Sequence, residues 1–236
     1  MEAPAHNLEL ASPSPQLKTE DSARQEPPPS PKTSPTASGS ARGRKLDPNV
    51  KRQIIADFKK QIDFVFGQVK DATGNFPRID RLEQVKSLPP AASSHVTLLA
   101  NQARLFRAQV GNEVTFYECL AEIQTVDSLV VVDEATRDIA AKDTPTARKT
   151  LSVFRSRYSE PANETQKALW RYIDSMFSLC ERLKTEAAGH LPRALALETS
   201  GKQSEALQEL REVYRIYPNP VTAEKIRQLE NRLRQQ

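Results

Sequence analysis

The residue types that usually perform catalysis are few and widely spaced in this sequence. The three histidines, His6, His95 and His190, form no HxxxH or HExxH pattern, and the seven glycines form no GxGxxG or phosphate-binding loop. Cys119 and Cys180 form no CxxC pair, so they indicate neither a zinc site nor a disulfide framework, and both are expected to be buried. We therefore expect no catalytic, cofactor-binding or metal-binding residue, and we expect that the protein is not an enzyme.

Carboxylates gather in two stretches where a metal site is conceivable. Paired carboxylates bind metal ions in helical bundles when Glu-x-x-His steps accompany them, and such steps are missing here. Aspartate and glutamate usually remain in solvent. We therefore predict solvated helix faces at the two clusters, which are Asp133, Glu134 and Asp138, and Glu113, Glu118 and Glu122.

Basic residues are only slightly in excess, with a formal net charge of +4. Both signs are interspersed after residue 45, unlike the one-sided excess of a nucleic-acid-binding surface, so no specific nucleic-acid partner is expected. One alternative stays open, a nucleic-acid-associated factor that uses a basic junction as an electrostatic contact. That junction consists of Arg42, Arg44, Lys45, Lys51 and Arg52.

A second basic run, from Arg211 to Tyr217, alternates arginine and tyrosine. Such a run can stack on bases or hold an acidic partner. Ordinary ion pairs with the interspersed Glu205, Glu209 and Glu212 are the better explanation.

Residues 1–45 differ in composition from the rest of the chain. They hold 8 of the 17 prolines and no aromatic residue, isoleucine or valine, so they cannot bury enough apolar surface to offset the entropy of ordering. This stretch is predicted to be a disordered tail.

The N-terminal stretch shows no leader-like apolar run. In the whole sequence the longest unbroken apolar run, residues 129–132, is too short to span a bilayer. We expect a soluble, cytoplasmic protein.

The remaining sequence predicts an all-α fold, because its apolar residues recur every three or four positions. The expected helices lie near 48–72, 79–88, 94–110, 113–142, 145–158, 161–187, 190–200, 203–217 and 220–234. The strand-like run at 129–132 has no second strand to pair with, so it is assigned to a helix.

Particular residues predict where these helices begin and end. A residue-proline step suits a helix start, because the first side chain caps free amides and proline fits the first turn. Such steps occur at Asp47-Pro48, Thr144-Pro145, Glu160-Pro161 and Asn219-Pro220. Glycine suits the position just past a helix. The expected ends lie at Gly74, Pro89-Pro90, Gly111 and Gly201.

Residues 187–220 resemble one tetratricopeptide repeat, a helix-turn-helix unit of 34 residues. The resemblance rests on a small residue in each helix, a glycine in the turn and apolar residues between the helices. These are Ala194, Leu197, Gly201, Ala206, Leu210, Val213 and Pro218. The sequence departs from the repeat at His190 and Arg193, where an aromatic residue and a leucine should open the first helix.

A fainter copy of the pattern occupies about 128–161. Its residues stand 59 positions before their counterparts, and they are Ala135, Ala147, Leu151, Phe154, Tyr158 and Pro161. A long helix at 161–187 would separate the two hairpins, so the array would be degenerate. The predicted organisation is a tail (1–45), a helical region of no recognised family (46–125) and a helical-repeat-like region (126–236) with a terminal capping helix.

Stacked tetratricopeptide hairpins leave a groove lined by the first helix of each pair, so the resemblance implies that the chain binds a protein or peptide. The lining positions would be Ala188, Leu191, Leu195 and Thr199, with Glu198 at the edge. An apolar groove suits an amphipathic partner helix. The alternative is that Leu191 and Leu195 pack against the helix at 161–187 as ordinary core residues.

We therefore expect a non-enzymatic interaction, scaffold or adaptor protein with the tail as tether or regulatory arm. The sequence leaves its oligomeric state open.

Overall fold

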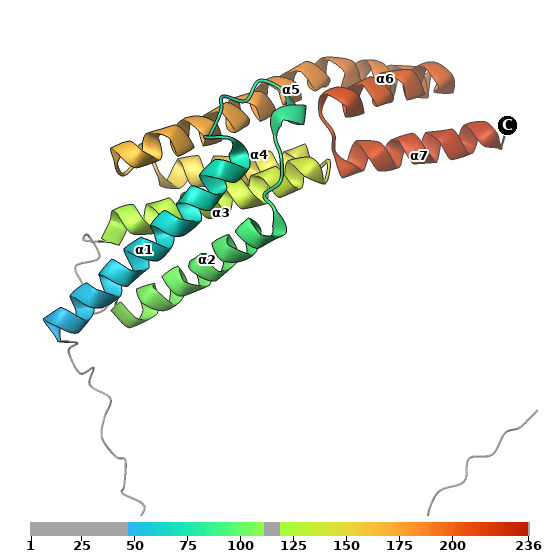
Figure 1. Cartoon of the computed structure of the whole chain (residues 1–236). Helices are drawn as coiled ribbons and strands as arrows, with labels where there is room; N and C mark the ends of the chain where they lie inside the picture. Colours follow the sequence, from blue (N-terminus) through green and yellow to red (C-terminus); the bar gives the residue numbers. More distant parts are fainter. Residues whose placement is uncertain (1–46, 111–118, 236) are drawn as a thin grey trace, which may run out of the picture. The chain divides into compact units, whose positions relative to one another are not determined.

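A computed structural model describes residues 47–110 and 119–235, except the side chains of 106–110. Within these ranges the chain is all-α, with seven α-helices, short 3-10 turns and no strand (Figure 1). The elements are α1 (Pro48–Thr73), η1 (Leu82–Gln84), α2 (Pro90–Val110), α3 (Leu120–Ala140), α4 (Thr144–Arg157), η3 (Glu164–Gln166), α5 (Lys167–Thr199), α6 (Gln203–Ile216) and α7 (Pro220–Arg234). The all-α prediction is confirmed. The predicted tail, and Gly111 as a helix end, lie outside the described residues.

Two of the four expected helix starts are confirmed. Asp47 Oδ1 accepts a hydrogen bond from the Asn49 amide (2.7 Å) at the start of α1. Asn219 Oδ1 accepts one from the Thr222 amide (2.8 Å) at the start of α7. In both helices proline follows the cap, where its missing N–H removes no helical hydrogen bond.

The other two starts were placed wrongly. The cap of α4 is Asp143, whose Oδ1 accepts from the Thr146 amide (3.2 Å), so Thr144 is already helical. Glu160-Pro161 starts no helix, because α5 begins at Lys167 after a 3-10 turn capped by Asn163. Aspartate and asparagine cap through a short side chain that reaches the backbone amides, whereas glutamate is a poor cap.

The predicted helix at 79–88 is wrong. Only the 3-10 turn Leu82–Gln84 forms there, and the side-chain oxygen of Gln84 accepts from the amides of Asp80 (2.8 Å) and Arg81 (3.0 Å). The residue before a proline disfavours helical backbone, and Pro89-Pro90 follows directly. Ile79, Val85 and Leu88 are nevertheless buried. Their apolar spacing therefore reflects burial of an irregular segment and not a helix. Pro90 opens α2 instead of closing a helix.

The predicted break between helices at 161–187 and 190–200 is also wrong. A single helix, α5, runs through Gly189 and Pro192. Ala187 and Ala194 lie on either side of these two residues and are buried, with α6 packed along this part of α5. Packing of a buried helix face outweighs the unfavourable helix propensity of one glycine and one proline.

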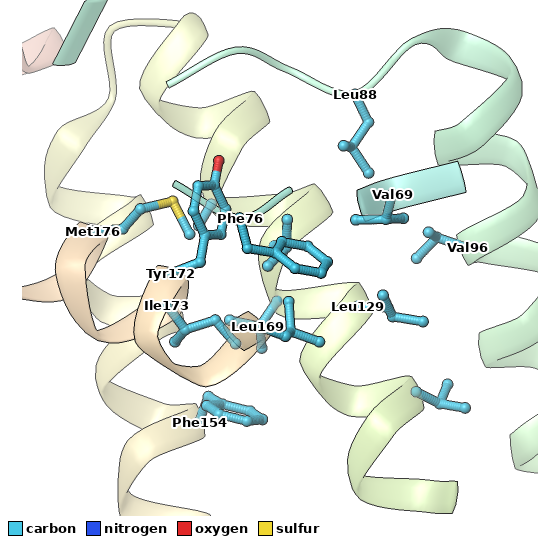
Figure 2. Close-up of a cluster of buried hydrophobic side chains, with 14 of the residues drawn as sticks. Val69, Phe76, Leu88, Val96, Leu129, Phe154, Leu169, Tyr172, Ile173 and Met176 are labelled. Atoms are coloured by element: carbon cyan, nitrogen blue, oxygen red, sulfur yellow. The ribbon is translucent and has the colours of Figure 1, made fainter. Parts of the chain in front are cut away.

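The main core lies where α1 to α5 meet. Figure 2 shows Val69 of α1, Val96 of α2, Leu129 of α3, Phe154 of α4 and Tyr172 of α5 in one buried cluster. This cluster runs from Phe58 to Cys180, so it contains residues on both sides of position 125. The run at 129–132 is helical within α3, as expected.

The C-terminal helices have a second core. Ala194 of α5, Ala206 and Leu210 of α6, and Leu229 of α7 are buried together. Gly201 lies in the turn between α5 and α6 with φ of 77°, and the Lys202 amide donates to the Leu197 carbonyl (2.9 Å). This left-handed position explains the glycine, because other residues are strained there.

Two glycines near the end of α5 should respond oppositely to alanine. Gly189→Ala is expected to raise the free energy of unfolding by roughly 0.5–1 kcal/mol, because residue 189 lies inside helix α5 and a Cβ added there meets open space. Gly201→Ala is expected to lower it by roughly 1–2 kcal/mol, because φ there is positive. Urea denaturation followed by circular dichroism measures both. If both substitutions changed the free energy of unfolding in the same direction, the bounds of α5 and α6 would be contradicted.

Candidate functional site

An exposed apolar strip runs along the second half of α5. Leu191 is 41% exposed and Leu195 is 44% exposed, one helical turn apart, and Ala188 and Thr199 extend the strip in both directions. These four positions are separated by three or four residues, so they share one side of the helix. The structure thus brings the predicted partner-binding residues together on one exposed face.

The packing alternative for the two leucines is wrong. The segment against which they were expected to pack is the first part of the same helix, α5, and both side chains remain partly in solvent. The buried positions of this part of α5 are Ala187 and Ala194, which face other helices.

Helix α7 borders this strip through Glu198, the residue predicted at its edge. Lys225 Nζ lies 2.8 Å from Glu198 Oε2, and Arg232 Nη1 lies 3.5 Å from Glu198 Oε1. The hydrogen bond from Lys225 holds the pKa of Glu198 below its ordinary value. Leu191 lies two turns before Glu198, so it shares the side of α5 that faces α7.

Val221 is a further exposed apolar residue, in the first turn of α7. It lies one turn before Lys225 on the same side of α7. We name the surface formed by Ala188, Leu191, Leu195, Glu198 and Thr199 of α5, with Lys225 and Arg232 of α7 at its border, the α5–α7 face. The border formed by Lys225 and Arg232 could not be predicted from the sequence, because their contacts with Glu198 depend on the orientation of α7.

The local sequence of α5 is unusual at this face. Gly189 and Pro192, the two residue types least suited to a helix interior, flank Leu191. Positions that violate local propensity concentrate at functional sites.

Four members of the two carboxylate clusters are described: Glu122, Asp133, Glu134 and Asp138. Within the described ranges, no three His, Cys, Asp or Glu side chains lie close enough to hold a metal ion. Asp133 corrects the prediction of a solvated face, because it is buried and its Oδ2 accepts from Ser93 Oγ (3.0 Å) and Arg137 Nη2 (2.6 Å). Glu122 lies 2.9 Å from Lys59 Nζ. Glu113 and Glu118 lie outside the described residues.

The cysteines and the described histidines occupy ordinary structural positions. Cys119 and Cys180 are buried, as expected, and burial raises the pKa of the Cys180 thiol to about 12. His95 Nδ1 lies 2.7 Å from Gln68 Oε1. His190 Nδ1 lies 2.9 Å from Glu209 Oε2.

A cleft of about 790 Å³ lies between residues 75–80 and the first half of α5, and the sequence analysis did not foresee it. Its lining includes Arg78, Arg171 and Arg182. Arg78 Nε lies 3.5 Å from Asp80 Oδ1, and Arg182 donates to the Asp80 carbonyl (2.6 Å). The Nε of Arg171 donates to the Lys167 carbonyl (3.3 Å). Since all three guanidinium groups have protein partners, the cleft does not by itself define an anion site.

Comparisons with protein-family models, curated proteins and solved structures give no match to this chain. The candidate site therefore rests on the geometry of the chain itself. No helix in the described ranges is long and apolar enough to cross a membrane.

The basic junction is only partly within the described residues. Arg52 Nη2 donates to Asn49 Oδ1 (2.9 Å) in the first turn of α1, and Lys51 is partly buried. Arg42, Arg44 and Lys45 lie outside the described residues. In the second basic run, one predicted ion pair forms, with Arg215 Nη2 2.5 Å from Glu212 Oε1. Arg211 Nη2 instead lies 2.7 Å from Glu230 Oε1 of α7, a partner outside the predicted set.

Proposed function

We propose that this chain is a non-enzymatic interaction protein, a scaffold or adaptor, whose α5–α7 face binds an amphipathic helix of a partner protein. The observation that carries the proposal is the pair Leu191 and Leu195, exposed one turn apart on a long regular helix. Adjacent exposed leucines on a helix are a typical anchor for the apolar face of a second helix. In this proposal the tail at 1–45 serves as a tether or regulatory arm, and the protein acts in the cytoplasm.

The charges beside the face indicate the chemistry of the partner. Glu198 is a single carboxylate shared between Lys225 and Arg232, so one positive charge is left over at this border. Lys184 is exposed one turn before Ala188. Complementary charge favours a partner helix that carries Asp or Glu beside its apolar residues.

The resemblance to a tetratricopeptide repeat is consistent with this role. In such an array α5 and α6 would form the hairpin, and α7 would stand where the first helix of the next repeat lies beside the groove. The pairing of α7 with Glu198 on the exposed side of α5 supports that arrangement.

Binding of synthetic helical peptides tests the proposal. One peptide carries leucine at positions i, i+3, i+4 and i+7 with glutamate elsewhere; a second carries lysine in place of glutamate. Fluorescence anisotropy is expected to show saturable binding of the acidic peptide to the full chain and weaker binding of the basic one. The variant Leu191→Glu with Leu195→Glu is expected to bind the acidic peptide at least about tenfold more weakly, which is roughly 1.4 kcal/mol.

The matched control is Val153→Glu, which changes an exposed apolar residue of α4 that is 53% exposed and should leave binding unchanged. Circular dichroism checks that each variant keeps its helix content. If the acidic peptide does not bind the wild-type chain, or binds the double variant equally well, the α5–α7 face is not the binding surface.

A further inference from the structure

Helices α1 and α2 each carry a second apolar strip besides the one in the core. In the part of the chain that the structure describes, ten large hydrophobic side chains are exposed, and five of them lie on these two helices. Phe64 and Leu98 are both 58% exposed, and Leu105 is 60% exposed. The set is Val50, Ile54 and Phe64 on α1, and Leu98 and Leu105 on α2.

The two strips meet along the seam between the helices. The rings of Phe64 and His95 are 5.6 Å apart, edge to face, and His95 also contacts Gln68. Leu98 follows His95 by one turn and Leu105 by a further two turns, while Val50 precedes Phe64 by four turns. Because α1 and α2 pack side by side (Figure 1), their strips form one continuous surface, the α1–α2 face.

This face carries no charge on its α2 half up to Ala103 and little net charge on its α1 half. Residues 90–103 contain no Asp, Glu, Lys or Arg. On α1, Asp57, Lys60 and Asp71 lie on the side of Val50 and Phe64, since Lys60 precedes Phe64 by one turn and Asp71 follows it by two turns. Lys60 Nζ lies 3.6 Å from Asp57 Oδ1, so two of these three charges are paired. An apolar surface with little net charge has a composition suited to an interface. It lacks the positive border of the α5–α7 face, so it does not select a partner of opposite charge.

The dimensions fit self-association. From Val50 to Gln68 the helix spans about 27 Å at roughly 1.5 Å per residue, and two adjacent helices are about 20 Å across. This gives about 540 Å² in projection for each copy and about 1,100 Å² for two, near the lower limit of a specific interface. A face with little net charge can also meet its own copy across a two-fold axis without strong repulsion.

We propose that the α1–α2 face is the contact between two copies of this chain. Packing of α1 and α2 against the same helices of the second copy forms a four-helix layer with Phe64 and Leu98 in its centre. Such a dimer carries two α5–α7 faces, so a scaffold built this way is bivalent.

Sedimentation equilibrium of the full chain over a concentration series tests this dimer. The wild-type chain is expected to show twice its mass of 26.4 kDa. Phe64→Glu combined with Leu98→Glu is expected to halve the measured mass to 26.4 kDa, because each copy then places two carboxylates in the contact. Leu105→Glu alone gives an independent measurement and is expected to weaken the dimer markedly. Val153→Glu is the control that should remain dimeric.

Two results would overturn this proposal: a wild-type chain that stays at one chain mass throughout the series, or a dimer that persists in the Phe64→Glu, Leu98→Glu chain and in Leu105→Glu. Helix content by circular dichroism confirms that a loss of mass reflects dissociation of folded chains. Leu191→Glu with Leu195→Glu is expected to leave the mass unchanged. Failure of the dimer is therefore distinguishable from failure of the proposed partner binding.

Discussion

Ala206→Leu is expected to lower the free energy of unfolding by roughly 1–3 kcal/mol. Ala206 is fully buried where α6 packs on α5, in the cluster that also contains Ala194, Leu210 and Leu229. Leucine adds three carbon atoms at a point where small residues allow two helices to approach closely. The space is already filled, so the helices must separate or neighbouring side chains must leave their preferred rotamers.

Gln208 is the matched control for this substitution. It lies on α6 two residues from Ala206 and is exposed, so Gln208→Ala is expected to change the free energy of unfolding by less than about 0.5 kcal/mol. Urea denaturation of both variants beside the wild type measures the difference. An Ala206→Leu chain as stable as the wild type would contradict close packing of α5 and α6 and, with it, the resemblance to a tetratricopeptide hairpin.

Elements with a long apolar period and a clear cap were predictable from the sequence. The bounds of α1 and α7 follow from Asp47-Pro48 and Asn219-Pro220, because the signals lie within a few residues of one another. The turn at Gly201 was predictable for the same reason, since a helix end needs only local backbone geometry.

The segments that failed depend on contacts distant in sequence. Residues 79–88 have apolar residues at helical spacing, but Ile79 donates its amide to Ser175 Oγ (3.1 Å) on α5 and Arg182 holds the Asp80 carbonyl. The burial of Asp133 depends in the same way on Ser93, which is 40 residues away. The local sequence pattern does not indicate these contacts between residues distant in sequence.

The candidate site was predictable in part. The spacing of Leu191 and Leu195 placed them on one side of a helix, but their exposure depends on where α6 and α7 pack. The α1–α2 face was missed although a signal was present, namely the uncharged stretch 90–103 and a second apolar strip on each helix. The periodicity of the core residues accounts for one side of each helix, whereas the exposed apolar residues lie on another side.

Pro192→Ala is expected to raise the free energy of unfolding by up to about 3 kcal/mol, because proline in a helix interior removes a backbone hydrogen bond and its ring crowds the preceding turn. Pro192 is exposed within α5, so alanine restores the amide that donates toward Ala188 without loss of buried packing.

Pro220→Ala is the control. Pro220 occupies the first turn of α7, where its missing N–H removes no helical bond, so no comparable gain is expected. Urea denaturation measures both changes, and a Pro192→Ala chain no more stable than the wild type would contradict an uninterrupted α5. Acidic-peptide binding by the same variant shows whether the backbone at Pro192 also shapes the α5–α7 face: weaker binding by a more stable chain is expected if this proline is retained for function at the expense of stability.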